Sequence, residues 1–486
     1  MHPYWPFHKS VAMTNPISTL SGNGSEGASS SRWAQVTLAL ATLLSSLGAS
    51  SPNVALPTFA AAFNASFGQV QWVLLAYLLA ITTVVVGAGR LGDIAGRRRV
   101  LLAGIGLFTF ASMLCALAPT LPLLIAARVV QGLGAAAMTA LTMACVGNAV
   151  PVAARSRALG LLVTMSAIGT AAGPWLGGGL LAWLGWPAIF GMNVPLGIAV
   201  YWLARRCLPP DRISAAACTQ GRFDHAGTVV LALALAAYAL SMTSGRAGFG
   251  AGNLALLVLA AAGLVLFVRI EQRASAPLVQ LALFRDRIVG AGLEINAMVS
   301  TVMMTTLVVG PFYLAHGLGL GVASVGLVLA VGPVMAALGG VPAGYLGGRF
   351  GARTLTAVGL LMLASGALAL SLMPLKAGLP GYLAALAALT IGYALFQASN
   401  NAAVMAQAPA GQGGVVSSLL SLSRNLGLVT GASVMGSVFA QGAGVWHSGA
   451  VHPEAMAAGM RLAFGAAAMI VIAALGITWL AKGRDR

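Results

Sequence analysis

Long apolar segments recur along this chain of 486 residues, and they constrain its fold more than any other feature. A helix that crosses a bilayer needs about 20 predominantly apolar residues. Only 7% of the residues are charged and the mean hydropathy is +0.91, whereas a soluble globular domain is about 25% charged. The sequence therefore predicts an all-α integral membrane protein with fourteen transmembrane helices. We predict these helices at residues 34–57, 71–90, 99–118, 121–148, 156–181, 187–204, 226–244, 252–270, 288–314, 322–345, 354–373, 380–407, 415–440 and 457–481.

The basic residues between these segments predict an orientation in the membrane. Cytoplasmic loops of membrane proteins are enriched in Lys and Arg. With a cytoplasmic amino terminus, 21 of the 26 basic residues lie inside, and Arg128 and Arg424 lie within segments. Only Arg246, Lys376 and Arg461 lie outside. We therefore predict a multi-pass protein of the plasma membrane, the inner membrane of a bacterium, with both termini cytoplasmic.

The formal net charge of +17 is distributed over alternate short loops rather than gathered on one face. A nucleic-acid partner is therefore not expected, because surfaces that bind nucleic acids concentrate their basic residues. Basic loops beside a membrane instead predict contact with anionic lipids. The cysteines Cys115, Cys145, Cys207 and Cys218 lack the spacing of metal ligands, so neither a metal nor a cofactor is expected.

The longest predicted loop between helices separates the first six of them from the rest, and it contains Pro209 and Pro210. Two similar stretches, Gly89–Arg99 and Gly344–Arg353, each follow the second helix of a six-helix block, which indicates an internal repeat. Repeats of this kind place a substrate site between the halves near the middle of the bilayer. We predict a disordered cytoplasmic tail at 1–32, a six-helix bundle at 33–207, a cytoplasmic linker at 208–225, an inserted helix pair with its loop at 226–287, and a second six-helix bundle at 288–486.

The first copy of the repeated stretch is predicted to form a tight, charged turn. Gly89 and Gly96 permit a sharp change of direction between packed helices, and Asp93 can cap a helix or pair with Arg97. The second copy has Gly348 where the acid would stand. Only the first copy is therefore complete.

The fourth predicted helix carries Arg128 and Gln131, which are unusual inside a membrane. Arg128 lies roughly 10 Å from the outer end of its helix at 1.5 Å per residue. A guanidinium at that depth costs at least about 2.5 kcal/mol unless it faces a partner or a wet cavity. We expect Arg128 and Gln131 to line a substrate or proton pathway, and the alternative is that Arg128 reaches the outer surface.

The fifth predicted helix contains glycines at a spacing of four residues, Gly169, Gly173 and Gly177, together with Pro174. Such a spacing makes a smooth face on which another helix can pack closely. Proline removes one backbone hydrogen bond and bends the helix. The segment is therefore expected to be a site of close helix packing.

The ninth predicted helix holds Glu294, the only carboxylate within any predicted segment, with Asn296 nearby. A buried carboxylate can exchange protons and gate access, so Glu294 is the candidate proton site. In the alternative reading, Glu294 reaches back to Arg285 or Arg287 at the membrane surface.

Polar side chains recur in the twelfth and thirteenth predicted helices, where Gln397, Asn400 and Gln407 share one helical face and Arg424 follows. These groups either line a polar path or hydrogen-bond between helices. The cluster favours the path.

Four stretches resemble motifs of the major facilitator superfamily. Residues 89–99 resemble its loop signature, residues 128–132 its Arg-x-x-Gln-Gly motif, and residues 169–178 the Gly-x-x-x-Gly-Pro-x-x-Gly-Gly pattern associated with antiport. Residues 47–57 resemble the Leu-Asp-x-Thr-x-x-Asn-Val-Ala-Leu-Pro segment of its fourteen-helix drug and proton antiporters, the EmrB/QacA-like multidrug exporters. Gly48 stands where that segment has its acid.

The resemblance covers residues 33–481 and implies a major facilitator fold of two six-helix bundles with an inserted helix pair. It implies a gating role for the loop of Gly89, Asp93, Gly96 and Arg97, and it places Asn53 on the substrate pathway. The implied activity is export of small amphipathic compounds, such as drugs, biocides or metabolites, by alternating access with proton antiport. An accessory efflux component is a further candidate partner.

Two alternatives to proton-coupled export remain, and Gly48 bears on the first of them. One is a uniporter or exporter of neutral or anionic solutes without proton coupling, with Arg128 as the contact for an anion. The other is a membrane-embedded enzyme, which the chain disfavours because it has no Gly-x-Ser-x-Gly nucleophile and no His-Glu-x-x-His zinc motif. ATP-driven transport is also disfavoured, since none of the lysines follows a glycine as a phosphate-binding loop requires.

Overall fold

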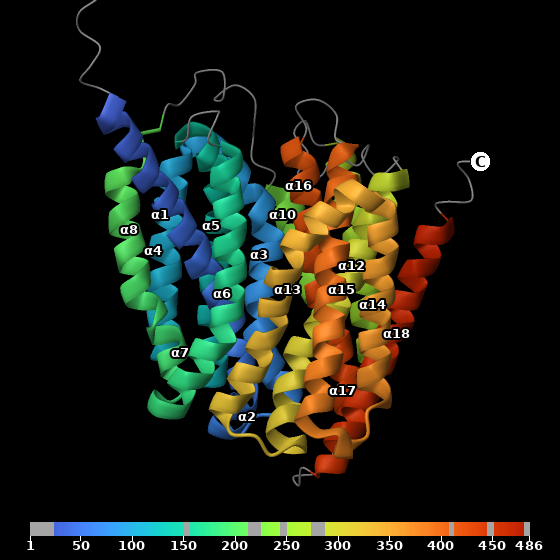
Figure 1. Cartoon of the computed structure of the whole chain (residues 1–486). Helices are drawn as coiled ribbons and strands as arrows, with labels where there is room; N and C mark the ends of the chain where they lie inside the picture. Colours follow the sequence, from blue (N-terminus) through green and yellow to red (C-terminus); the bar gives the residue numbers. More distant parts are fainter. Residues whose placement is uncertain are drawn as a thin grey trace, which may run out of the picture.

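The structure is a computed structural model, and it describes residues 24–149, 155–211, 225–243, 250–273, 287–407, 413–444 and 452–480. Helices make up nearly all of this part of the chain, and it contains no strand. The helices stand side by side, and both ends of the described chain lie at one face of the bundle, here called the terminal face (Figure 1). The opposite end is called the distal face.

The N-terminal bundle comes first, and its helices follow the apolar segments of the sequence. Its elements are α1 (Gly24–Ser50), η1 (Ser51–Ala55), α2 (Leu56–Ala62), α3 (Phe67–Ala95), α4 (Arg97–Ala116), α5 (Leu121–Ala149), α6 (Arg155–Leu184), α7 (Pro187–Gly191) and α8 (Asn193–Cys207). The first membrane-crossing run is broken by the 3₁₀ turn η1, where Pro52 cannot donate a backbone hydrogen bond.

A pair of helices and then the C-terminal bundle complete the fold. The pair is α10 (His225–Thr243) and α11 (Ala251–Arg273). The C-terminal bundle consists of α12 (Arg287–Phe312), η4 (Tyr313–Gly317), α13 (Val322–Phe350), α14 (Ala352–Leu372), η5 (Leu375–Ala377), α15 (Gly378–Ala406), α16 (Gly413–Thr430), η6 (Gly431–Met435), α17 (Gly436–Gly442) and α18 (Pro453–Leu480). Helix α10 packs on α11 and also contacts α3 and η6, so the pair lies beside the boundary between the two bundles.

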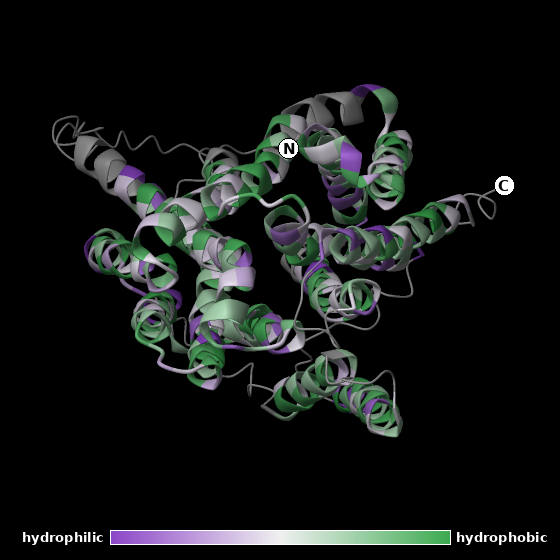
Figure 2. Ribbon diagram, turned by 90° about the horizontal axis from the view of Figure 1, so that it is seen from below, coloured by the Kyte–Doolittle hydropathy of each residue, from purple (hydrophilic) through white to green (hydrophobic). Residues whose placement is uncertain are grey.

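Ten helices of the described chain are long and apolar enough to cross a membrane, and two shorter apolar helices lie at 226–242 and 322–336. A view along the helix axes shows that apolar residues dominate most of them (Figure 2). The predicted all-α membrane fold is confirmed. The number of fourteen spans stays a prediction.

Helix α1 begins at Gly24, earlier than the sequence predicts. The prediction of a disordered segment is therefore wrong for residues 24–32, and residues 1–23 lie outside the described chain. Once the apolar part of α1 has formed a helix, each residue added at its end gains one hydrogen bond without a new nucleation step. Polar Ser and Gly residues can therefore extend it.

A single glycine separates the second helix of each bundle from the third. Gly96 lies between α3 and α4 with φ of +102°, and Gly351 lies between α13 and α14 with φ of +81°. A side chain strains the backbone at such angles, whereas glycine adopts them readily. The predicted loop at residues 89–99 is thus mostly helix with one sharp turn, and the equivalent turn in the second bundle supports the internal repeat.

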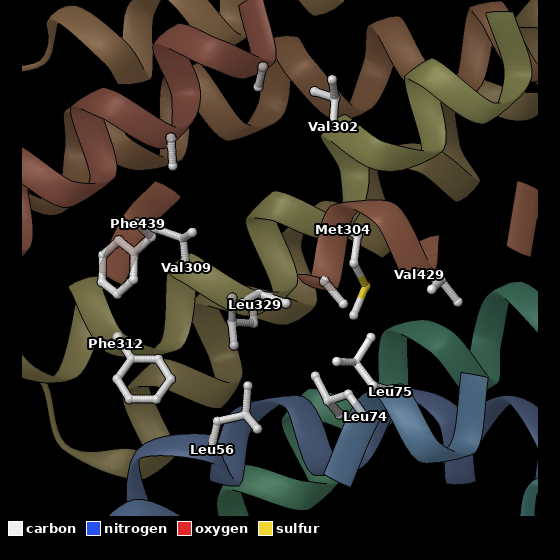
Figure 3. Close-up of a cluster of buried hydrophobic side chains, with 14 of the residues drawn as sticks. Leu56, Leu74, Leu75, Val302, Met304, Val309, Phe312, Leu329, Val429 and Phe439 are labelled. Atoms are coloured by element: carbon white, nitrogen blue, oxygen red, sulfur yellow. The ribbon is translucent and has the colours of Figure 1, made fainter. Parts of the chain in front are cut away.

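The two bundles share a hydrophobic core near the distal face. Leu56 of the N-terminal bundle lies near Phe312 of the C-terminal bundle, and Leu74 and Leu75 lie beside Met304 (Figure 3). All five side chains are buried. Apolar packing therefore joins the bundles at this end.

Candidate functional site

Arg128 lies in the interior of the N-terminal bundle and is 0% exposed. Its Nε donates a hydrogen bond to the carbonyl oxygen of Val73 on α3 (2.9 Å), and its Nη1 donates to the carbonyl oxygen of Gly48 on α1 (3.0 Å). Nη1 also donates to the side-chain oxygen of Gln131 (2.6 Å). The guanidinium therefore joins α5 to two neighbouring helices.

Gln131 and two aromatic rings complete the surroundings of Arg128. The amide nitrogen of Gln131 donates to the Ser112 hydroxyl on α4 at 2.8 Å. The guanidinium carbon lies 4.0 Å from the ring centre of Tyr77 and 5.8 Å from that of Phe190, within the range of cation–π attraction. This position does not fit the alternative in which Arg128 reaches the outer surface.

The space beside Gly48 is filled by an aromatic ring. A β-carbon built at position 48 would overlap the tip of the Phe108 ring, and Phe108 is fully buried. An acid at position 48 therefore does not fit in this packing. Instead, the Gly48 carbonyl oxygen accepts a hydrogen bond from Arg128.

The turn at Gly96 is held by Asp211, a residue that the sequence analysis did not select. The carboxylate oxygens of Asp211 accept hydrogen bonds from the backbone N–H groups of Arg98 (2.8 Å) and Arg99 (3.1 Å). These groups belong to the first turn of α4, where N–H groups lack partners within the helix. Asp211 therefore caps α4, and a β-carbon at Gly96 would collide with it. An acid directly after Pro209 and Pro210 was the available sequence signal.

Two arginines tie the same turn to other helices. Arg97 donates to the carbonyl oxygen of Ala144 on α5 (3.0 Å), and Arg98 donates to that of Arg205 on α8. The side chain of Asp93 lies outside the described part of the structure. At Gly351 in the second bundle, a β-carbon would meet nothing within 4 Å. The two turns share a backbone shape but differ in their contacts.

The glycines of α6 pack against the first helix rather than across the bundle boundary. A β-carbon at Gly169 would lie 2.7 Å from the Ser46 β-carbon, and one at Gly177 would lie 2.9 Å from the Ser51 carbonyl oxygen. Gly173 faces Ser50 in the same way. This stripe therefore provides close packing between α6 and the run formed by α1 and η1.

The next glycine along α6 faces the other bundle. A β-carbon at Gly326 on α13 would lie 2.9 Å from the α-carbon of Gly178 and would also collide with the carbonyl oxygen of Pro174. The two backbones approach closely because neither glycine has a side chain. Pro174 and Gly178 thus lie at the boundary between the bundles.

A hydrogen bond also crosses this boundary at Gln71, which the sequence analysis did not select. Its side-chain nitrogen donates to the carbonyl oxygen of Ala432 at 2.9 Å, and Gln71 is buried. Ala432 lies in η6, a π-helical turn. Such turns leave carbonyl groups displaced from the regular helix pattern and are frequent at functional sites.

The predicted polar residues of the C-terminal bundle divide into a buried group and a more accessible group, and Asn296 and Asn400 form the buried group. Asn296 donates to the carbonyl oxygen of Leu420 at 3.0 Å, and Asn400 donates to that of Gly292 at 3.1 Å. Both asparagines are buried and hydrogen-bond between helices. In the N-terminal bundle, Asn53 donates to the carbonyl oxygen of Ser50 within its own run.

Two of the remaining predicted residues are exposed and one is half-buried. Glu294 on α12 and Arg424 on α16 are exposed, while Gln397 on α15 is half-buried and donates to Asn401. The carboxylate of Glu294 forms no ion pair with Arg287 in the described structure, and Arg285 lies outside the described residues. Glu294 and Arg128 therefore lie in different bundles and different surroundings. No group of three or more His, Cys, Asp or Glu side chains suited to a metal gathers in the described residues.

Comparison with protein families gives a match to the Major Facilitator Superfamily at residues 38–432 and 293–485. The chain belongs to this superfamily. Its curated relatives include the multidrug resistance protein Stp of Mycobacterium tuberculosis, which is 33% identical over 83% of this chain and 74% of the relative. The drug efflux pump JefA of Mycobacterium tuberculosis is 30% identical over 83% of this chain and 78% of the relative. The riboflavin transporter RibZ of Clostridioides difficile is 30% identical over 84% of this chain and 88% of the relative.

Solved structures of other transporters share the fold. A bacterial homologue of the human lysosomal transporter Spinster, in an inward-facing and unoccupied conformation, matches with a TM-score of 0.66 at 17% identity, covering 93% of this chain and 97% of the other. A peptide transporter in complex with sulfate matches with a TM-score of 0.68 at 14% identity, covering 92% and 94%. These structures show the fold, whereas the family match and the curated relatives show that the chain is a multi-pass major facilitator transporter and not an enzyme.

Proposed function

We propose that this major facilitator protein exports small amphipathic compounds across the plasma membrane by alternating access, driven by proton antiport. The observation that carries the proposal is the boundary between the bundles at the distal face. There, Gly178 meets Gly326 and Gln71 bonds to Ala432. Apolar packing, a glycine contact and the Gln71 hydrogen bond involve no covalent link or ion pair among the residues named here, so they can separate and re-form as two rigid bundles rock. The names of the relatives Stp and JefA support drug export.

The proposed orientation places the terminal face, with both termini, in the cytoplasm. Arg205 and Arg206 lie in the last turn of α8, and the guanidinium carbon of Arg206 lies 3.8 Å from the ring centre of Trp202. Basic and aromatic residues at one helix end are typical of the cytoplasmic membrane surface, where they contact anionic lipids. The proposal also retains fourteen spans, with α10 and α11 as the inserted pair.

Glu294 is proposed to carry the proton, with Gln397 and Arg424 on the same pathway. Its exposure on α12 allows it to exchange protons with an aqueous path between the bundles. Fluorescence of a ΔpH probe in respiring everted vesicles tests this role. Adding an amphipathic compound should lower the ΔpH of vesicles that contain the overexpressed protein, because protons leave the lumen in exchange for the compound. The ΔpH of vesicles without the protein should stay unchanged.

The matched variants are Glu294→Gln and Glu454→Gln, since Glu454 is another exposed acid but lies in the first turn of α18. Glu294→Gln should abolish the ΔpH response at equal protein level, and Glu454→Gln should retain it. A full response in Glu294→Gln would remove Glu294 from the proton pathway.

Transport without proton coupling is the second candidate, favoured by the packing of Phe108 beside Gly48. This packing leaves no space for an acid next to Arg128. The two candidates differ in their response to a protonophore. Proton antiport requires that a protonophore abolish accumulation of a labelled compound in everted vesicles, whereas uncoupled transport continues down the compound's own gradient.

A further inference from the structure

The charge of Arg128 has no counter-charge within its bundle. The three groups that accept its hydrogen bonds are the carbonyl oxygens of Val73 and Gly48 and the amide oxygen of Gln131, and all are neutral. Its Nη2 is buried and has no hydrogen-bond partner. A buried charge without a partner is costly, and within membranes such residues mark ion or substrate paths.

The sequence of the N-terminal bundle supplies no acid that could neutralise Arg128. Residues 33–207 contain one carboxylate, Asp93. Asp93 lies twenty residues along α3 from Val73, which is roughly 30 Å at 1.5 Å per residue. Phe108 fills the space beside Gly48. The positive charge of Arg128 therefore stays unneutralised for two reasons: the bundle has no nearby carboxylate, and Phe108 leaves no space for one beside Gly48.

The C-terminal bundle does not offset this charge. Within its predicted spans it carries two arginines, Arg424 and Arg461, and one carboxylate, Glu294, and all three are exposed. The arginines of these spans outnumber the carboxylate, so the positive charge of Arg128 is not offset by the other bundle. A low-dielectric surrounding screens such a charge weakly, so its field extends beyond the side chain itself and favours anions over cations nearby.

From this charge balance we infer that the transported compound carries an acidic group, a carboxylate, sulfonate or phosphate, and that Arg128 selects it over cationic compounds. The inference rests on the proposed transport function but not on proton coupling. Gly48 and Phe108 are specificity-determining residues, because together they exclude a neutralising acid from the side of Arg128.

A pair of xanthene dyes tests the inference, since the anion carboxyfluorescein and the cation rhodamine 123 share a ring system and differ in charge. Their uptake is measured in everted vesicles at zero membrane potential, set with valinomycin and equal potassium concentrations. The chain should transport the anionic dye in preference to the cationic one. Equal or faster transport of rhodamine 123 would overturn the inference and leave the exporter proposal standing. Transport of neither dye would instead contradict the proposed export of amphipathic compounds.

Two double variants separate the effect of a negative charge beside Arg128 from the effect of the altered packing. Gly48→Asp/Phe108→Leu makes space for a carboxylate beside Arg128, and Gly48→Asn/Phe108→Leu makes the same space for a neutral group of the same size. The ratio of anionic to cationic transport should be at least about tenfold lower in the Asp variant than in the Asn variant. Equal ratios at equal protein levels would show that the charge at Arg128 does not select the substrate.

Discussion

Arg128, directly and through Gln131, connects its own helix α5 to three other helices. Its Nε and Nη1 bond to carbonyl groups on α3 and α1, and Gln131 connects the same guanidinium to α4. The planar fork of arginine suits this role because its donors point in several fixed directions. Lysine has a single ammonium group and cannot reach the same acceptors together.

Arg128→Lys is therefore expected to destabilise the protein while keeping its charge. Either the Val73 or the Gly48 carbonyl loses its donor, and a buried polar group without a partner costs about 1–3 kcal/mol. Thermal unfolding of the purified protein in detergent measures the effect. Arg461→Lys is the control, since Arg461 is exposed. Equal melting temperatures for the two variants would mean that these hydrogen bonds do not stabilise the bundle.

Asp211 is a second single residue that stabilises local structure, because it caps α4 at the turn of Gly96. Asp211→Ala removes the cap of α4, a loss that costs about 0.5–2 kcal/mol in other helices. The amide hydrogens of Arg98 and Arg99 should then exchange with solvent faster, as measured by hydrogen exchange with mass spectrometry. Asp211→Asn keeps one oxygen acceptor and should show a smaller change. Unchanged exchange in Asp211→Ala would exclude the cap.

The sequence predicted some of these residues and not their partners. Arg128 is recognisable because a charge in an apolar segment requires a partner. Its partners are backbone carbonyls, which every residue has, so no side-chain pattern predicts them. Asp211 was missed because it belongs to the linker in sequence and to the turn at Gly96 only in space. The roles of Glu294 and Arg424 stay predictions.

At the scale of helices, close contact between α6 and α13 depends on glycine. Gly178 and Gly326 meet backbone to backbone, while the neighbouring Gly179 has nothing within 4 Å of its β-position. The glycine pattern of α6 was predicted as a packing face. Its division into a face toward α1 and a single contact with α13 required the relative placement of three helices, which the spacing alone does not contain.

Gly178→Leu should prevent closure at the distal face, because a leucine side chain does not fit between the two backbones. Gly179→Leu is the matched control. Cysteines introduced at the buried distal positions Leu74 and Phe439 report the closure through their labelling by a water-soluble maleimide. Labelling should rise several-fold in Gly178→Leu relative to Gly179→Leu. The same labelling in both variants would show that this contact does not close the boundary.

The lengths of the apolar segments predicted where the helices lie, but they predicted the first and last residues of the helices less accurately. Helix α3 runs through the predicted loop to Ala95 because glycine inside a helix costs only about 1 kcal/mol. Tertiary packing of α3 on α5 offsets that cost. The chain turns only at Gly96, where a positive φ ends the helix.

At the scale of the whole molecule, two bundles joined at the distal face define the proposed transport cycle. Superfamily membership and the bundle architecture were predictable, since repeated motifs and apolar periodicity are properties of the sequence. The contacts at the boundary were not, because Gln71 and η6 are far apart in the chain. Alternating access requires that these contacts break while the terminal face closes.

The most direct test is a pair of distances measured by double electron–electron resonance in a variant whose four cysteines are replaced by serine. Spin labels at the exposed positions Ala62 and Gln441 report the distal face, and labels at Ala95 and Arg353 report the terminal face. With a transported compound added, the distal distance should lengthen while the terminal distance shortens. Two distances that stay constant, or that change in the same direction, would contradict alternating access.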